Sequence, residues 1–337
     1  MLESHGTQKY PYLKAILLDQ PGTPDTLRLG VIDEPTARPG EILIRVHACG
    51  LNPVDVGVAG GGNPAWSWPH VLDLDAAGTI EALGEGVTEF EIGQRVVFHG
   101  DLRREGGLAE LVTAPATILA TIPDEVTFEQ AAAPPCAGMT AFQAVHRRLH
   151  VSAGQTILIT ADAGGVGGYA IQLAKKMGAK VITTCSEANI ERVKNLGADE
   201  VINYRTENVV GRVKELPNGR GVDAVIDTVS TESATKKLSL LVHGGGLVSI
   251  AGRPDGSVIE PFTYAVSLHE IALGAAHSHG DEKAQADLRV MLEELMAAVA
   301  DGSLDPMLAH VVPLDQAPDA LARIKTGHGH GRTVVTI

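Results

Sequence analysis

Cysteine is scarce in this sequence of 337 residues: Cys49, Cys136 and Cys185 lie far apart, and none belongs to a Cys-x-x-Cys pair. Three scattered thiols exclude a disulfide framework and fit a reducing compartment. No apolar run reaches the roughly 18 residues of a membrane helix, and residues 1–9 are polar where a signal peptide would be apolar. We therefore expect a cytoplasmic protein that does not enter a membrane.

Basic residues are also few, with 27 Lys and Arg against 41 Asp and Glu and a net charge of -14. Nucleic acids and anionic membranes are bound by basic surfaces, so we expect neither as a partner. This balance still permits a basic pocket for one phosphate. The hydrophobic content of 44% is that of a globular protein, and the chain is long enough for two domains with a large core.

Short segments rich in Val, Ile and Leu dominate the first 130 residues, and Gly and Pro separate them. They predict strands at residues 14–18, 41–49, 78–83 and 95–99. This pattern is typical of a small β-barrel or a compact β domain.

From residue 156 onward, apolar runs alternate with helical patterns. The runs predict strands at residues 156–160, 180–184, 200–203, 224–227 and 247–250, with helices at 167–177, 189–196, 208–216 and 231–242. Such alternation predicts a parallel, doubly wound sheet. After residue 271 the pattern changes to a long helix at 281–300, a strand, a short helix at 316–326 and a last strand at 333–337.

A glycine-rich turn joins the first of these strands to the first helix, with the sequence Ala161-x-x-Gly164-x-x-Gly167. In this context Gly164 lets the backbone approach a pyrophosphate, and Gly167 lets the helix pack on the strand. Together with Gly165 and Val166, the turn would present free N–H groups and a helix N-terminus to the anion. A tight turn without a ligand is the alternative. The βα units that follow favour a nicotinamide dinucleotide.

The end of the second strand bears on the choice of cofactor, because an acidic residue there would hold the adenosine ribose of NAD. This strand is followed by the neutral Ser186 and then by Asn189 and Arg192. A hydroxyl near a cation suits a 2′-phosphate and favours NADP(H) over NAD(H). Glu187 leaves NAD open, and Arg192 has the alternative of a solvated helix residue.

Several short stretches carry a resemblance to a known family: Gly50-Leu51-Asn52-Pro53-Val54-Asp55, Asp75-Ala76-Ala77-Gly78, Gly84-Glu85-Gly86-Val87, Gly93-Gln94-Arg95-Val96, Gly107-Leu108-Ala109-Glu110, Ala137-Gly138-Met139-Thr140-Ala141, Leu196-Gly197-Ala198-Asp199 and Ile202-Asn203-Tyr204-Arg205. On these stretches the chain resembles the medium-chain dehydrogenase/reductase superfamily, in its zinc-free quinone oxidoreductase-like branch, from about residue 14 to 337. The resemblance implies an α/β fold with a GroES-like β-barrel catalytic domain and a Rossmann doubly wound parallel-sheet domain. The GroES-like catalytic domain would consist of residues 1–132 and a return segment, residues 272–337. The Rossmann domain would consist of residues 133–271. It also implies a homodimer or homotetramer.

Zinc is not expected. Zinc-dependent members of the superfamily place a Cys where this chain has Asn52 and a His where it has Leu74. Cys136 matches a third ligand position, but catalytic zinc needs three protein ligands and one thiol makes no site. The four closely spaced Cys of a structural zinc lobe are also missing. Cys49 is expected to be a small buried residue rather than a ligand.

The resemblance implies roles for individual residues. Asn52 and Thr140 would flank the nicotinamide or a substrate carbonyl. Tyr204 would lie against the adenosine, and Arg332 would lie near the cofactor. The nicotinamide would be approached by Ser249, Ala251 and Gly252. Structural alternatives are a turn cap for Asn52, a backbone-bonded helix residue for Thr140, a strand-end aromatic for Tyr204 and a surface charge for Arg332. Some relatives have tyrosines shortly after the Asn-x-x-Asp segment, where this chain has none. Trp66, Trp68 and His70 follow instead as candidates for the substrate pocket, with His70 a candidate proton donor; loop aromatics packing on the barrel are the alternative.

Without a metal, alcohol oxidation loses its usual means of stabilising an alkoxide. Hydride addition to the β-carbon of an enone or quinone needs only hydrogen-bond donors for the enolate and a later proton. We therefore expect an NADPH-dependent oxidoreductase that reduces quinones or α,β-unsaturated carbonyls without zinc. The alternatives are a zinc-free alcohol dehydrogenase or ketoreductase, and a non-catalytic NADPH-binding, redox-sensing protein.

Overall fold

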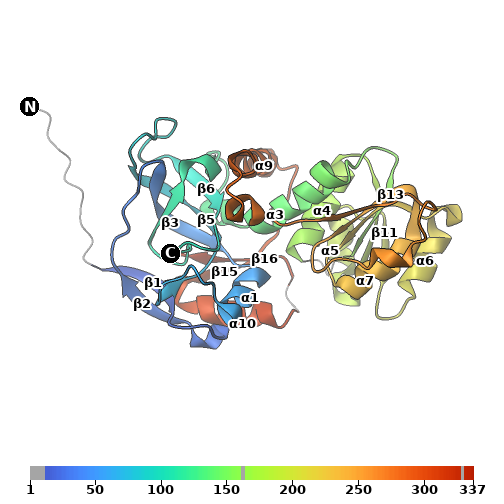
Figure 1. Cartoon of the computed structure of the whole chain (residues 1–337), viewed down its shortest axis with the longest axis horizontal. Coiled ribbons are helices and arrows are strands. Elements are labelled where there is room, and N and C mark those ends of the chain that lie inside the picture. The colour runs from blue at the N-terminus through green and yellow to red at the C-terminus, as the bar shows by residue number, and fades with distance from the viewer. Residues whose placement is uncertain (1–11, 161–163, 328–329) are drawn as a thin grey trace, which may run out of the picture.

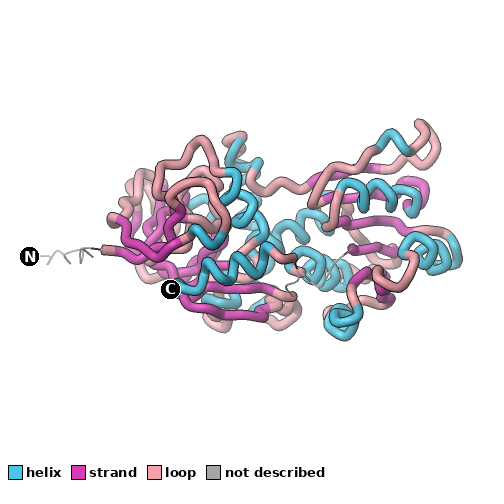
Figure 2. Tube along the Cα trace, turned by 90° about the horizontal axis from the view of Figure 1, so that it is seen from below, coloured by secondary structure: helices cyan, strands magenta, loops and turns pink. Residues whose placement is uncertain are grey.

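The structure is a computed structural model that describes residues 12–160, 164–327 and 330–337. Two bodies lie side by side (Figure 1), one built on mainly antiparallel strands and the other on a parallel sheet. Seen from below in Figure 2, the two groups of strands are separate, and helices lie between them. The mixed α/β architecture is the one predicted. Among the described residues, no helix is both long enough and apolar enough to cross a membrane.

The parallel sheet has six strands in the order β11-β10-β9-β12-β13-β14. Its strands are β9 (Thr156–Thr160), β10 (Lys180–Cys185), β11 (Glu200–Asn203), β12 (Val222–Asp227), β13 (Leu241–Ser249) and β14 (Ser267–Glu270). Every neighbouring pair is parallel. This is the doubly wound order of a Rossmann fold, in which the chain changes direction between β9 and β12.

Helices cover both faces of this sheet because its side chains alternate between them. Ile157 and Ile159 of β9 join the cluster that contains α3 (Pro135–Phe142), α4 (Gly165–Lys176) and α5 (Ile190–Asn195). Leu158, between them, faces α6 (Val209–Glu215) and α7 (Thr231–Lys237). Burial on both faces explains why the strands were recognisable as short, continuous apolar runs.

The predicted helix at residues 231–242 is wrong in its second half. α7 ends at Lys237, a 3-10 turn follows at Leu238–Leu240, and β13 begins at Leu241. Leu241 pairs with Val222 of β12, and a register shift then leads to Gly246 opposite Ala224. Pairing with a distant strand therefore overrides the local helical pattern.

The barrel contains two sheets. A three-stranded sheet is formed by β1 (Leu13–Leu18), β2 (Arg28–Ile32) and β4 (His70–Val71). A seven-stranded sheet contains β3 (Glu41–Gly50), β5 (Asp75–Leu83), β6 (Arg95–His99), β7 (Leu111–Pro115), β8 (Ala120–Thr121), β15 (Leu308–Pro313) and β16 (Arg332–Thr336). β16 pairs with β3, so the end of the chain returns to its beginning. The domain limits at residues 132 and 271 stay a prediction.

Helices that accompany the barrel include α1 (Pro53–Gly61), α2 (Phe128–Ala132) and α10 (Ala317–Lys325). α1 extends into a run of glycines, including Gly60 and Gly61, and Gly62 is its C-cap. Asn52 stands at its N-cap and Pro53 in its first turn, and the Asn52 N–H donates to Asp55 Oδ2 at 2.7 Å. A good N-terminus thus starts a helix in a glycine-rich segment.

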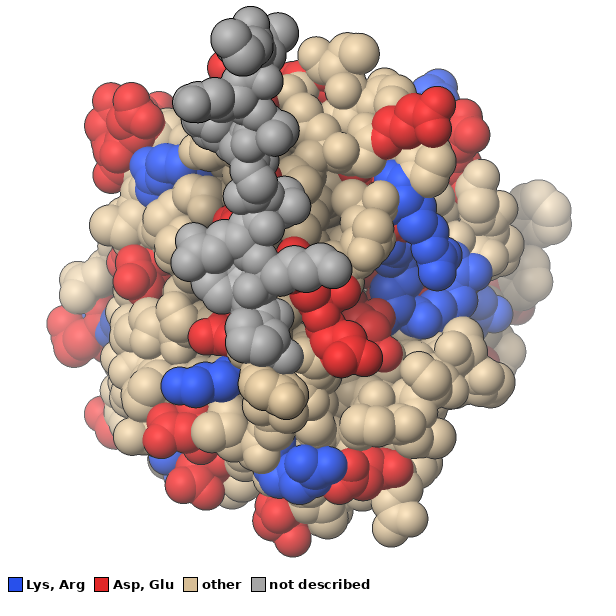
Figure 3. All heavy atoms as spheres, turned by 90° about the vertical axis from the view of Figure 1, so that its left-hand side faces the viewer, with Lys and Arg blue, Asp and Glu red and all other residues tan. Residues whose placement is uncertain are grey.

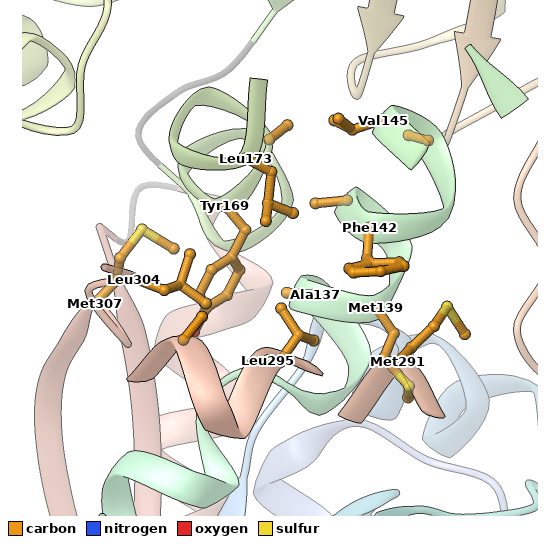
Figure 4. Packing of buried hydrophobic residues seen from close by; sticks show 14 of the residues in the cluster. Ala137, Met139, Phe142, Val145, Tyr169, Leu173, Met291, Leu295, Leu304 and Met307 are labelled. Carbon is orange, nitrogen blue, oxygen red and sulfur yellow. The ribbon is translucent and has the colours of Figure 1, made fainter. Parts of the chain in front are cut away.

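The long helix α9 (Glu282–Ala300) joins the two bodies through one hydrophobic cluster. Figure 4 shows Met291 and Leu295 of α9 among Met139 and Phe142 of α3 and Tyr169 of α4. The same cluster includes barrel residues such as Ala48, Ala77 and Val97, so the two bodies share a core.

Gly50, at the end of β3, offers a test of how closely this core is packed. A Cβ added there would collide with the carbonyl oxygen of Ala132, whereas a Cβ at Gly57 in α1 would meet nothing within 4 Å. We expect Gly50→Ala to lower the free energy of unfolding by about 1–3 kcal/mol. Gly57→Ala should leave it unchanged or raise it by up to about 1 kcal/mol. Urea unfolding checks both; equal effects would contradict the packing described.

Candidate active site

A cleft of about 680 Å³ lies at the carboxyl end of the parallel sheet, between the two bodies. Its Rossmann wall includes residues 164–167, Thr228, Ile250 and Ala251. Its barrel wall is formed by Leu51, Pro53, His310, Arg323, Ile324, Thr326, Gly327, His330, Gly331, Arg332 and Thr333. The described lining contains two arginines and two histidines but no carboxylate. This is where a doubly wound sheet binds ligands, and its charge suits an anion.

The glycine turn lies against the barrel wall. Gly164 is the N-cap of α4, and Gly165 lies next to Ala137 and Arg332: an added Cβ would be 2.8 Å from the Ala137 Cβ and 3.1 Å from Nη1 of Arg332. Ala161 lies outside the described residues. Gly168, which was not predicted as part of the site, continues the same glycine run; a side chain there would collide with Met307.

A buried carboxylate, Asp75, organises the residues behind this cleft. Its Oδ2 accepts hydrogen bonds from Asn52 Nδ2 at 2.8 Å and from the Cys136 N–H at 2.9 Å. Its Oδ1 lies 2.6 Å from Nδ1 of His99, and Arg332 Nη2 is 3.7 Å from Oδ2. Strands β5 and β6, helix α3 and the C-terminal strand β16 therefore meet at one side chain.

Asn52 is part of this network. Its Nδ2 donates both to Asp75 and to the carbonyl of Gly50 at 2.7 Å, and its Oδ1 accepts from Arg332 Nη2 at 2.8 Å. The residue is 1% exposed. Since an amide nitrogen has only two protons to donate, Asn52 has none left for a substrate carbonyl in this arrangement. It holds its neighbours, and a direct contact with substrate is not supported.

Thr140 and His70 have different surroundings. Thr140 lies one turn beyond Cys136 on α3 and is 7% exposed. His70 stacks on Trp66, with ring centroids 4.0 Å apart, and lines another cavity of about 600 Å³ that shares no lining residue with the cleft. The structure does not bring His70 to the glycine turn, and the alternative of aromatics packing on the barrel describes it better.

Sequence reasoning did not identify His99 or the central role of Asp75. Asp75 stood in one of the family-like stretches, and the two residues are directly paired across β5 and β6. Polar residues next to the apolar runs of two strands, Asp75 before Ala76-Ala77 and His99 after Val96-Val97-Phe98, were the available signal. Their pairing depends on the register of the strands, which the sequence does not reveal.

Asp75, His99 and Cys136 each offer a metal-ligating atom, and these atoms lie within 4.8 Å of one another. The donor set does not fit zinc as it stands, however. Both oxygens of Asp75 already bind Nδ1 of His99, Asn52 and the Cys136 N–H, and Arg332 already supplies a nearby positive charge. Leu74, at the usual histidine position, offers no ligand atom.

Two further buried acids lie near Asp75. Burial and the charge of Asp75 raise the pKa of Asp55 to about 8, although the Asn52 N–H opposes this. Burial, with Asp55 and Asp75, raises the pKa of Asp73 well above its usual range. The pKa values of Cys49 and Cys136 are raised by burial and by these carboxylates. Cys49 is thus the small buried residue that was expected.

The end of β10 is the predicted adenosine site. Ser186 is 9% exposed there, and Asn189 Nδ2 lies 3.4 Å from its Oγ. Glu187 accepts a 2.9 Å hydrogen bond from Asn203 Nδ2. The Tyr204 N–H donates to the carbonyl of Cys185, which brings Tyr204 beside Ser186. Its neighbour Arg205, which the sequence analysis overlooked, has its guanidinium 5.9 Å from the Tyr204 ring centre.

Arg192 does not join Ser186. Its guanidinium lies against Gly331, where an added Cβ would be 2.7 Å from Nη2. The side chain lines a separate cavity with Lys175 and Lys176, and its Nε has no hydrogen-bond partner among the described residues. We therefore do not retain Arg192 as a phosphate ligand.

The residues predicted near the nicotinamide follow β13. Ala251 lines the cleft, while Ser249 is buried and its hydroxyl donates to the Gly252 carbonyl. Thr228, which was not predicted, lines the cleft at the end of β12 and is held by a 2.6 Å hydrogen bond from its Oγ1 to the Thr160 carbonyl. It follows the strand next to β9, where the doubly wound order reverses.

Comparison with known proteins agrees with this architecture. The family model described as alcohol dehydrogenase GroES-like domain matches residues 38–124, and the one described as zinc-binding dehydrogenase matches residues 165–296. Quinone oxidoreductase of Pongo abelii is 31% identical over 95% of this chain and 96% of its own length.

Two solved structures show the same likeness. The quinone oxidoreductase of Coxiella burnetii has a TM-score of 0.84 at 31% identity, covering 97% of this chain and 99% of that chain. CurK enoyl reductase has a TM-score of 0.85 at 25% identity, covering 96% of this chain and 99% of that chain.

The fold and the site define an oxidoreductase of a family that binds a nicotinamide cofactor. The chain belongs to the medium-chain dehydrogenase/reductase superfamily and is quinone oxidoreductase-like within it. The predicted pairing of a GroES-like domain with a Rossmann domain is confirmed.

Replacing Asp75 tests the buried network. Asp75→Asn removes the charge facing Arg332 and places an amide N–H among donors, so the free energy of unfolding should fall by about 3–5 kcal/mol. The matched control is Asp19→Asn, which breaks the exposed pair with Arg28 and should change the free energy of unfolding far less, because exposed ion pairs contribute little. Urea unfolding measures both, and losses of similar size would refute the central role of Asp75.

Asp55 predicts a particular pH dependence of stability. Its pKa is about 8 in the folded chain against 3.8 as the ordinary value, so between these the folded state holds a proton that the unfolded state has lost. The contribution of this group to the free energy of unfolding therefore falls as pH rises from about 4 to about 8.

Asp55→Asn removes this titration and keeps an oxygen for the Asn52 N–H. The difference in melting temperature, variant minus parent, should become more positive with rising pH up to about 8 and then level off. In the control, Asp19→Asn, the difference should stay flat over this range, because the hydrogen bond from Arg28 lowers the pKa of Asp19 below 3.8. Parallel curves for both variants would contradict the assignment.

Proposed function

We propose that this chain is an NADPH-dependent reductase of quinones or α,β-unsaturated carbonyls that works without zinc. The observation that carries the proposal is the cleft at the glycine turn, whose charged lining residues are basic. Behind the cleft, Asp75, Asn52 and Arg332 form a hydrogen-bonded network at the place where zinc-dependent relatives hold their metal. The similarity to quinone oxidoreductases and to an enoyl reductase supports the substrate class.

The residues at the end of β10 support NADP(H) over NAD(H). Ser186 is neutral, and Arg205 adds a cation near Tyr204. Glu187, the residue that would otherwise hold the ribose hydroxyl of NAD, is hydrogen-bonded to Asn203. In this proposal residues 164–167 bind the pyrophosphate, while Ser186, Asn189 and Tyr204 surround the adenosine phosphate. The nicotinamide, when bound, supplies the hydride.

The reaction asks little of the side chains. Addition of hydride to a conjugated C=C bond leaves an enolate, which needs a hydrogen-bond donor and then a proton. Thr140 is the hydroxyl that we propose for the first task, and solvent is the proposed source of the proton. Asn52, Asp75 and Arg332 are positioning residues, because their polar atoms bind one another.

Assembly and location are proposed from the family likeness. We propose a homodimer or homotetramer in the cytoplasm, with a small carbonyl or quinone substrate and no nucleic acid or membrane partner. The net charge of -14 supports the last two exclusions.

The function is tested by following NADPH oxidation with a quinone, an enone and the corresponding saturated ketone, each with and without a chelator. We expect turnover of the quinone or enone, no turnover of the ketone, at least about tenfold higher kcat/KM with NADPH than with NADH (~1.4 kcal/mol), and no loss with chelator. Turnover of the ketone alone would favour the alcohol dehydrogenase alternative. Activity that requires added zinc would overturn the metal-free assignment, and binding without turnover would favour a sensor.

A further inference from the structure

The barrel wall of the cleft carries a pair of histidines. His310 comes from β15 and His330 from the segment just before β16, and their ring centroids are 5.6 Å apart at an interplanar angle of 62°. Both line the cleft whose other wall contains the glycine turn. Both are exposed, so protons from solvent reach them.

The charged side chains that line the cleft together with this pair are all basic. Arg323 of α10 and Arg332 of β16 line the same wall, and the described residues of the Rossmann wall include no titratable side chain. Arg332 is already engaged by Asn52, the Ala133 carbonyl and Asp75. No ion pair joins His310, His330 or Arg323 to a carboxylate within the described ranges. Their charge is therefore directed at whatever anion enters the cleft.

This local charge runs against that of the whole chain. The net charge is -14, and Figure 3 shows acidic side chains scattered over the end of the barrel, with basic ones gathered mainly in one group. A basic wall in an acidic protein favours an anionic ligand at this place.

We propose that His310 and His330, together with Arg323, form a clamp for the pyrophosphate of the dinucleotide, and that protonation of the two histidines tightens cofactor binding as pH falls. The inference rests on the proposed function, because it requires a dinucleotide on the glycine turn. The turn contributes N–H donors, which do not titrate, from one side. The histidines contribute charge from the other side, and imidazole gains that charge between about pH 8 and pH 5.

Thermodynamic linkage between protonation and dinucleotide binding makes the proposed clamp measurable. If the protonated form of the protein binds a ligand better, the protein takes up protons when the ligand binds. The dissociation constant of the ligand must then become smaller as the pH is lowered, by the same coupling free energy. NADP⁺ has a 2′-phosphate that titrates near pH 6, whereas the pyrophosphate stays charged throughout. NAD⁺ is therefore the second probe: a pyrophosphate clamp acts on both dinucleotides, and a 2′-phosphate site acts on NADP⁺ alone.

The experiment is calorimetric titration of the full chain with NADP⁺ and with NAD⁺ at about pH 6 and about pH 8, in buffers of different ionisation enthalpy. The variants are the double substitution His310→Gln, His330→Gln and the single substitution Arg323→Gln. His243→Gln is the matched control, because His243 is exposed near the start of β13, at the end of the strand away from the cleft.

In the parent and in His243→Gln, both dinucleotides should bind roughly tenfold tighter at the lower pH, with net proton uptake. The double variant should show less than about threefold change with NAD⁺ and no proton uptake. Arg323→Gln should weaken binding at both pH values by a similar factor. Full pH dependence in the double variant, or an effect restricted to NADP⁺, would overturn the clamp. Failure of the parent to bind either dinucleotide would instead overturn the proposed function.

Discussion

The carboxylate of Asp75 is the interaction on which the arrangement of the site depends. Its two oxygens hold an amide of the barrel, a backbone N–H of α3, a histidine of β6 and, at longer range, the guanidinium of β16. A buried charge is tolerated only when it is paired and hydrogen-bonded. The requirement to satisfy Asp75 therefore brings Asn52 and Arg332 together, with Arg332 next to Gly165, and so shapes the barrel wall of the cleft.

The same requirement explains the state of the neighbouring acids. Asp55, Asp73 and Asp75 are all buried, and Arg332 is the one arginine that forms an ion pair with any of them within the described chain. Burial is the main reason that the pKa values of Asp55 and Asp73 rise, and repulsion by the neighbouring carboxylates adds to it. The site thus combines one fully hydrogen-bonded acid, Asp75, with two acids whose pKa values are raised.

Much of this could be predicted from the sequence, and the exceptions have a common physical cause. The strands of the parallel sheet are buried on both faces and were recognisable from their apolar runs alone, as was the glycine turn after β9. The end of α7, the pairing of Asp75 with His99 and the direction of Arg192 were not predictable. Each depends on which distant segment lies opposite, as does the separation of His70 from the cleft, and local pattern carries no information on that.

The late position of Arg332 in the chain has a consequence for biosynthesis. Its guanidinium binds Asn52 and the carbonyl of Ala133, and its strand pairs with β3, yet Arg332 is made 280 residues after Asn52. A nascent chain can form the parallel sheet from its own middle segment while the edge of β3 stays open and the acids beside it lack their arginine. Closure of the barrel must therefore wait until β16 has been made, so a ribosome that stalls or terminates before Arg332 releases a chain with a parallel sheet but an unfinished barrel wall of the cleft.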